Sequence, residues 1–159
     1  MMRKPRTHAM DSTDRALLRL LQRDATLTAE TLGRLLNLSA SQAGRRRARL
    51  DAEGYIRATT ARLDPAKLGL SVQAFVQVQM ASHAPTQAKA LLRLLETEPR
   101  VASVWTLTGE ADYLLRVWCE DLASLNDLIQ RVLLPHEAVA RVQSQIALDQ
   151  PKRDAPLPV

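Results

Sequence analysis

Hydrophobic residues in the first third of the chain recur every three or four positions, a spacing that predicts helices with one buried face. Three such stretches follow one another, and each begins after a residue that can cap a helix, namely Asp11, Thr28 and Ser39. The inward-facing positions are Leu17, Leu20, Leu21, Leu32, Leu35, Leu36, Ala43, Arg47 and Leu50. We therefore expect a small helical domain over residues 10–62.

The third stretch joins a helix start to a high positive charge. Ser39 and Gln42 stand three residues apart, as in a capping box, and Asn37 before them suits a left-handed turn. The helix then carries Arg45, Arg46, Arg47 and Arg49. A helix, a short turn and a capped basic helix are typical of a helix-turn-helix, whose second helix enters the DNA major groove. The alternative is that the basic run is only a solvated helix face.

Residues around this helix add one expectation and leave two questions. Gly54 suits the end of the helix, and the extended stretches 55–57 and 59–63 predict two short strands that would form a wing. Arg47 occupies an inward position, where its methylene groups would cover the core. Gly44 inside the helix costs about 1 kcal/mol relative to alanine. Neither residue is explained by the pattern itself.

The second half of the chain changes to a period of two. Alternation over residues 72–80, and again near residues 101–108, 113–119 and 140–148, predicts four strands. Two amphipathic helices separate them, with Ala88, Leu91, Leu92 and Leu95 in one and Leu122, Leu125, Leu128, Ile129 and Val132 in the other. This β-α-β-β-α-β order predicts a ferredoxin-like domain over residues 71–150, with both helices on one face of an antiparallel sheet.

The other face of that sheet combines aromatic and polar side chains. It would carry Gln73, Phe75, Gln77, Trp118, Arg141 and Gln143. Large aromatic groups on an uncovered face indicate a protein interface, although a solvated face with ordinary exposed aromatics is the alternative. Residues 63–70, with Pro65 and Gly69, are expected to be a linker, and the proline-rich residues 151–159 a disordered tail.

Charge and composition separate the two halves further. Fourteen Lys or Arg and seven Asp or Glu lie in residues 1–70, against eight and ten in residues 71–159. This predicts a module that binds a polyanion joined to one with another task. Residues 1–9 are expected to be a flexible basic arm. No apolar run approaches 18 residues and Cys119 is the single cysteine, so we expect a cytoplasmic protein without a disulfide, metal cluster, cofactor or membrane contact.

The chain resembles the Lrp/AsnC (feast/famine) transcriptional regulators over nearly all of residues 10–150. The matching segments are residues 10–18 (MDSTDRALL), Leu38-Ser39, Arg46, Leu50, Gly54-Tyr55-Ile56, Leu63-Asp64-Pro65, Leu68-Gly69, and residues 108–115 (TGEADYLL). Two positions depart from the family pattern, because Arg47 stands where an apolar residue is usual and Ala138-Val139 replaces Gly-Val. No single segment is specific, but their order and spacing together are.

The resemblance implies an α+β architecture, with a winged helix-turn-helix followed by a ferredoxin-like effector and oligomerisation domain. It also implies a homodimer that assembles into tetramers or octamers, double-stranded DNA as a partner, and an amino acid or related small molecule bound between subunits. Thr108, Gly109 and Asp112 match the loop near the effector site. A carboxylate such as that of Asp112 suits an ammonium group. A plain hairpin turn is the alternative interpretation of this loop.

We thus expect a sequence-specific transcriptional regulator and not an enzyme. The expected DNA-facing residues are Ser39, Ser41, Gln42, Arg45, Arg46, Arg49 and Arg57. One alternative is an enzyme, because some siroheme decarboxylases resemble the same family; His83 and His136 would then be the candidate haem ligands. Another is an architectural protein that compacts DNA with little sequence preference, using the same residues.

Overall fold

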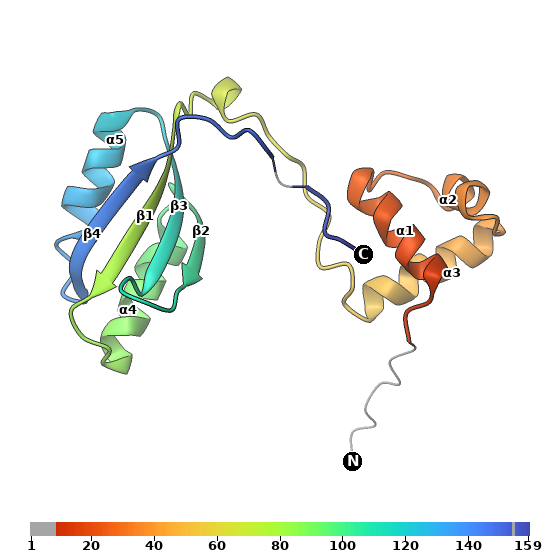
Figure 1. The fold of residues 1–159 in the computed structure, drawn as a ribbon, viewed down its shortest axis with the longest axis horizontal. Coiled ribbons are helices and arrows are strands. Elements are labelled where there is room, and N and C mark those ends of the chain that lie inside the picture. Colours follow the sequence, from red (N-terminus) through yellow and green to blue (C-terminus); the bar gives the residue numbers. More distant parts are fainter. Residues whose placement is uncertain (1–8, 154) are drawn as a thin grey trace, which may run out of the picture. The chain divides into compact units, whose positions relative to one another are not determined.

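The computed structural model describes residues 9–153 and 155–159, so the arm expected over residues 1–9 falls almost wholly outside it. The chain divides into two compact units, one formed by residues up to Arg62 with those from Lys152 onward, the other by Leu63–Pro151 (Figure 1). In chain order the elements are α1 (Ser12–Arg23), α2 (Ala29–Leu36), α3 (Ala40–Ala52), η1 (Ala66–Leu68), β1 (Val72–Met80), α4 (Pro85–Thr97), β2 (Val101–Thr106), β3 (Tyr113–Cys119), α5 (Leu122–Asp127), η2 (Leu128–Leu133) and β4 (Val139–Ile146). The predicted fold class, a helix-turn-helix followed by an α+β unit, is confirmed.

The helical unit packs around a small apolar cluster. Leu17 and Leu18 of α1 and Leu50 of α3 are buried together, and Ile56 packs against them. All three expected N-caps form, since the side chains of Asp11, Thr28 and Ser39 each accept a bond from a main-chain N–H of the first turn. One inward position was predicted wrongly: Leu35 is 51% exposed, because α2 turns Leu32 and Gly33 inward instead.

The two wing strands expected over residues 55–57 and 59–63 are not formed. Gly54 takes a positive φ of 79° just after α3, as expected, and the N–H groups of Tyr55 and Ile56 then bond back to the carbonyl of Leu50. Ile56 is thereby used to cover the helical core, and the residues that follow it up to Leu63 are exposed. Because an isolated two-stranded hairpin is marginally stable in water, this exposed stretch has nothing to hold it as a wing.

The second unit is one antiparallel sheet with the strand order β2-β3-β1-β4, the ferredoxin-like arrangement predicted (Figure 1). Pairing places Val76 opposite Leu115 and Val78 opposite Tyr113, so alternate residues of β1 and β3 share one face. Leu91 and Leu95 of α4, with Leu125 and Leu128 beyond β3, pack on that same face. This sandwich of helices and one sheet face is the larger core of the chain.

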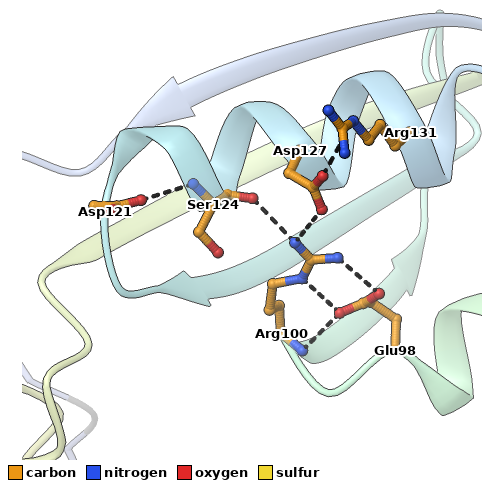
Figure 2. Close-up of polar contacts among 6 residues, drawn as sticks. All are labelled: Glu98, Arg100, Asp121, Ser124, Asp127 and Arg131. Atoms are coloured by element: carbon orange, nitrogen blue, oxygen red, sulfur yellow. Dashed lines mark hydrogen bonds and ion pairs between the residues drawn. The ribbon is translucent and has the colours of Figure 1, made fainter.

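An arginine ties the start of β2 to α5. Arg100 lies 2.7 Å from an oxygen of Glu98 through Nε, and its Nη1 donates to Asp127 and to the carbonyl of Ser124, each at 3.1 Å (Figure 2). Asp127 also pairs with Arg131 at 3.5 Å. The hydrogen bond from Arg100 is the main reason why the pKa of Glu98 lies below its ordinary value. We call Glu98, Arg100, Asp127 and Arg131 the sheet-unit cluster.

The opposite sheet face carries no helix of its own unit, as predicted. Registers place Gln73 opposite Trp118, Gln77 opposite Gln143 and Gln79 opposite Arg141, so all the expected face residues lie on one side. Trp105 and Leu114 extend this side, because they pair with each other across β2 and β3. Trp105 is 44% exposed. The face is therefore a broad mixture of aromatic, aliphatic and amide groups.

The composition predicts a disordered tail over residues 151–159, of which the structure describes residues 155–159 in contact with α1. The main chain of Leu157 forms two hydrogen bonds with the side chain of Gln22, and that of Val159 accepts one from Arg19. Among the described residues, no helix is both long and apolar enough to cross a membrane.

Candidate nucleic-acid interface and effector loop

The start of α3 is fixed by the predicted capping box. The N–H of Gln42 donates to Ser39 Oγ at 3.2 Å, and the N–H of Ser39 donates to Gln42 Oε1 at 2.9 Å. Asn37 before it adopts the left-handed conformation, with φ 55°. Gly33 allows the close approach of α2 to this turn, because a Cβ there would stand 2.7 Å from the carbonyl oxygen of Leu38. The angle between the two helices is thus set by backbone contacts.

A buried carboxylate binds α3 to α1. Asp14 is fully buried and accepts from Arg46 at 2.7 Å and from Arg49 at 2.5 Å, while Arg46 also reaches Asp11 at 2.7 Å. Burial favours the neutral acid, yet hydrogen bonds from Arg46, from the main chain of Asp11 and from Arg49 outweigh it and lower the pKa of Asp14. We call Asp11, Asp14, Arg46 and Arg49 the helical-unit cluster.

Of the two residues that the sequence left unexplained, Arg47 has a reason in the structure and Gly44 has none. The guanidinium of Arg47 donates to the carbonyl oxygens of Leu27 at 2.9 Å and Ala25 at 3.2 Å, so it holds the loop between α1 and α2. The side chain is half-buried, and its charge satisfies carbonyls that an apolar residue would leave unbonded. Gly44 faces Ala29, where an added Cβ would sit at an ordinary 3.6 Å, so packing alone does not require glycine there.

The predicted DNA-facing residues divide into three groups. Gln42, Arg45, Arg46 and Arg49 line one open hollow of 330 Å³ with Leu38. Ser39 and Ser41 lie at the helix start, where their hydroxyl oxygens are 3.1 Å apart. Arg57 is not brought to the hollow; it lines a separate groove formed with α1.

The arginines of this surface differ in whether their guanidinium groups are free to contact DNA. Arg45 is exposed and has no hydrogen bond or ion pair within the part of the chain that the structure describes. The side chains of Arg46 and Arg49 are only 30% and 31% exposed and are held by carboxylates. The pairs of Arg46 and Arg49 with Asp14 could not be predicted from the sequence, because their members lie 32 and 35 residues apart. One signal was present, because Asp14 stands three residues before Leu17 and so falls on the buried stripe of α1.

In the loop of residues 107–112, where the resemblance implies an effector site, Asp112 binds other parts of the protein. Its Oδ2 accepts from the N–H of Met80 at 2.7 Å, and its Oδ1 lies 2.7 Å from Nε2 of His83. The main-chain bond to Met80 is the largest cause of its lowered pKa, followed by the bond from His83. Gly109 takes φ 114°, which glycine adopts easily, and Thr108 is exposed. Both oxygens of Asp112 therefore have partners before any ligand arrives.

Beside this loop, a polar hollow of 30 Å³ opens on the uncovered sheet face. Gln77, Gln79 and Gln143 line it together with Glu110 and Arg141. Glu110 and Arg141 lie 3.6 Å apart and place opposite charges at its rim. Glu110 belongs to the loop of residues 107–112 but was not among the residues predicted from the sequence to lie near an effector. The hollow is too small by itself for an amino acid.

The two histidines considered as haem ligands have protein partners. His83 is bound to Asp112, and Nδ1 of His136 accepts from the N–H of Ala138 at 3.1 Å. Within the described residues, no group of three or more His, Cys, Asp or Glu is arranged to hold a metal ion.

Comparison with known protein families gives two matches that together span most of the chain. The AsnC-type helix-turn-helix domain matches residues 10–51, and the Lrp/AsnC ligand binding domain matches residues 73–157. The DNA-binding transcriptional activator DecR of Escherichia coli (strain K12) is 32% identical over 150 residues, which cover 94% of this chain and 99% of that protein.

Two solved structures are similar over the whole fold. One is the L-Met complex of the transcriptional regulator NMB0573 from Neisseria meningitidis, with a TM-score of 0.89 and 32% identity over 93% of this chain and 96% of the other. The second is an AsnC family transcriptional regulator from Agrobacterium tumefaciens, with a TM-score of 0.87 and 34% identity over 94% and 97%.

Proposed function

Because this chain belongs to the Lrp/AsnC family of DNA-binding transcriptional regulators, we propose that it reads operator DNA with the start of α3 and answers to an amino acid held beside residues 107–112. The observation that carries the DNA part is the hollow lined by Gln42, Arg45, Arg46 and Arg49. Basic side chains gathered at the N-terminal half of a recognition helix suit contacts to phosphate and guanine.

Arg45 has the leading role in this proposal. It is the exposed arginine of α3 without a carboxylate partner among the described residues, so it reaches DNA without first breaking an ion pair. Arg46 and Arg49 orient the helix through Asp14 and present their remaining N–H groups to phosphate. Ser39, Ser41 and Gln42 contribute at the helix start, and Arg57 meets a flanking phosphate.

The DNA proposal is tested by measuring affinity for an operator and for unrelated DNA at near-physiological salt. Arg45→Ala is expected to weaken operator binding by about 1–3 kcal/mol, which corresponds to a five- to 150-fold loss of affinity. Arg93→Ala, which removes the same charge from an exposed position of α4, is the matched control and should stay within twofold. An unchanged affinity for Arg45→Ala would overturn the assignment. A ratio of specific to non-specific affinity near one would favour the architectural alternative.

A second copy of the chain is the proposed cover for the uncovered sheet face. Phe75, Trp105 and Trp118 lie on one side of the sheet, and two copies facing each other would bury all of them. Pairing the DNA-binding units in this way also predicts half-sites about one helical turn apart or a multiple of it. Trp118→Arg should shift sedimentation toward the monomer, whereas the same change at the exposed Leu148 should not.

The effector is proposed to bind where that second copy closes the hollow beside the loop. Arg141 would face the carboxylate of an amino acid and Glu110 its ammonium group, with Thr108, Gly109 and Asp112 shaping the loop. The test is footprinting with a panel of amino acids, repeated with Arg141→Gln. One amino acid should alter the protection of the unmodified protein and have no effect on this variant. An equal response of both would place the effector elsewhere.

A further inference from the structure

The helical unit has an apolar groove on the side of α1. It measures 300 Å³ and is lined by Leu18 and Leu21 of α1 and by Tyr55 and Ile56 after α3. Leu18, Leu21 and Ile56 belong to the small core of the unit, so the groove opens directly onto that core. Leu157 and Val159 complete its lining. The end of the described chain therefore forms one wall of this groove.

The contacts in this groove recognise an extended main chain. Gln22 uses both ends of its amide: Nε2 donates to the carbonyl of Leu157 at 3.2 Å, and Oε1 accepts from the N–H of Leu157 at 2.6 Å. Nε of Arg19 donates to the main-chain oxygen of Val159 at 2.5 Å. The Leu157 side chain stays 75% exposed, so this residue is held by its backbone. Val159 is half-buried and contributes an apolar side chain to the lining of the groove.

The sequence of the docked segment lowers the cost of docking. Residues 155–159 read Ala-Pro-Leu-Pro-Val, with prolines on both sides of the residue that Gln22 binds. Proline fixes its own φ, and a residue before proline is biased to an extended conformation. The free segment thus already favours the extended shape and loses little entropy on binding. Proline-containing segments of this kind characteristically dock in grooves with an aromatic wall, which Tyr55 provides here.

Docking of residues 155–159 links the two units of the chain a second time. The chain leaves the helical unit after Arg62, forms the sheet unit, and returns to the helical unit at Lys152. With residues 155–159 docked, the helical unit is attached to the sheet unit by two chain segments. Between β4 and the docked segment lie roughly eight residues, which reach at most about 28 Å. A second short attachment restricts the positions that the recognition helix can sample.

We propose that the groove formed by α1 and residues 55–59 is the binding site for residues 155–159 of the same chain, and that this docking restricts the spacing of DNA half-sites that the regulator accepts. The docking itself rests on the contacts of the groove, and only the consequence for DNA rests on the proposed function. Two attachments limit the separations that the helical units of an assembly can reach. The affinity for operators whose half-sites have a matching spacing should therefore rise, and the affinity for other spacings should fall.

The docking is tested by hydrogen exchange of the Leu157 amide in the full-length protein, measured by NMR. We expect protection in the unmodified protein and at least tenfold faster exchange in Gln22→Ala. Arg15→Ala, an exposed change on the same helix, is the matched control and should leave the rate unchanged. Val159→Asp should also accelerate exchange, while Leu148→Asp should not. An unprotected Leu157 amide in the unmodified protein, or protection that is lost on dilution, would overturn docking within one chain.

The consequence is tested with two operators that differ by five inserted base pairs between their half-sites. The ratio of the two affinities should fall severalfold in Gln22→Ala and Val159→Asp and stay constant in Arg15→Ala. An unchanged ratio in the presence of a protected Leu157 amide would overturn the restriction on spacing. A protein that binds neither operator would refute the proposed function, and the exchange measurement would still decide the docking.

Discussion

In the helical unit one buried carboxylate, Asp14, is shared by two arginines, whereas in the sheet unit one arginine, Arg100, is shared by two carboxylates (Figure 2). Each cluster contains two acidic and two basic side chains, but the surroundings differ. The helical unit has a small apolar core, and its cluster joins α1 to the recognition helix α3. The sheet unit has a continuous core between two helices and four strands. Ion pairs therefore contribute a larger share of the unfolding free energy in the helical unit than in the sheet unit.

The largest effect that would test this contrast is the loss of the Asp14 charge. Asp14→Asn leaves Arg46 and Arg49 without their buried partner, and breaking such a pair costs about 3 kcal/mol of unfolding free energy. Urea unfolding followed by NMR signals of α1 and α3 measures this loss. Asp51→Asn, at an exposed position of α3, is the control and should change the free energy little. A loss below 1 kcal/mol would mean that the apolar core alone holds the unit.

The matching change in the sheet unit should cost less. Glu98→Gln removes the strongest partner of Arg100, but Asp127 and the carbonyl of Ser124 still accept from it. We expect a loss of about 1.5 kcal/mol, the value for one charged hydrogen bond. Unfolding followed by tryptophan fluorescence reports on this unit alone, because Trp105 and Trp118 both lie in it. A loss as large as that for Asp14→Asn would break the comparison.

The two clusters should begin to lose their stabilising contributions at different pH values as the solution is acidified. Both carboxyl groups have folded-state pKa values below their ordinary ones, so each stabilises fully above the ordinary value and loses its contribution as the pH falls through the lower folded pKa. The ordinary values are 4.5 for Glu98 and 3.8 for Asp14. The stability difference between the unmodified protein and Glu98→Gln should therefore begin to shrink at a higher pH than that for Asp14→Asn. The reverse order would contradict the assignment.

The smallest expected effect is a gain. Gly44→Ala places a Cβ 3.6 Å from that of Ala29, without a clash, and alanine favours a helix over glycine. The helical unit should gain about 0.5–1 kcal/mol, measured by its urea midpoint. Gly33→Ala is the opposite case, since its Cβ would stand 2.7 Å from the carbonyl of Leu38, and it should destabilise. If Gly44→Ala also destabilised, a constraint other than packing would act at that position.

Local signals in the sequence were enough for most of the fold. The caps at Asp11, Thr28 and Ser39, the left-handed Asn37 and the period-two strands are each decided by neighbouring residues, and all are confirmed. The wing failed because extended propensity at residues 55–63 says nothing about a partner strand. Ile56 found a better place against the helical core.

The candidate site was less predictable because its side chains bind residues that are far away in the sequence. Arg45, Arg46 and Arg49 look alike in the sequence, yet only Arg45 is left without a partner among the described residues. Arg47 stands where an apolar residue is usual, and its reason lies in two carbonyl groups of a loop twenty residues earlier. Asp112 suited a ligand ammonium by chemistry, but the structure gives both its oxygens to Met80 and His83.

The sheet order has a consequence for the way the chain is synthesised. Strand β1 lies in the middle of the sheet, between β3 and β4, yet it leaves the ribosome first and β4 follows roughly sixty residues later. Until residues 139–146 emerge, one edge of β1 has unpaired N–H and C=O groups that can pair with any other extended chain. Residues 155–159, which dock on α1, emerge later than β4. A nascent chain of this protein therefore cannot complete the sheet unit until its last strand has emerged, and during that interval the free edge of β1 is exposed to aggregation.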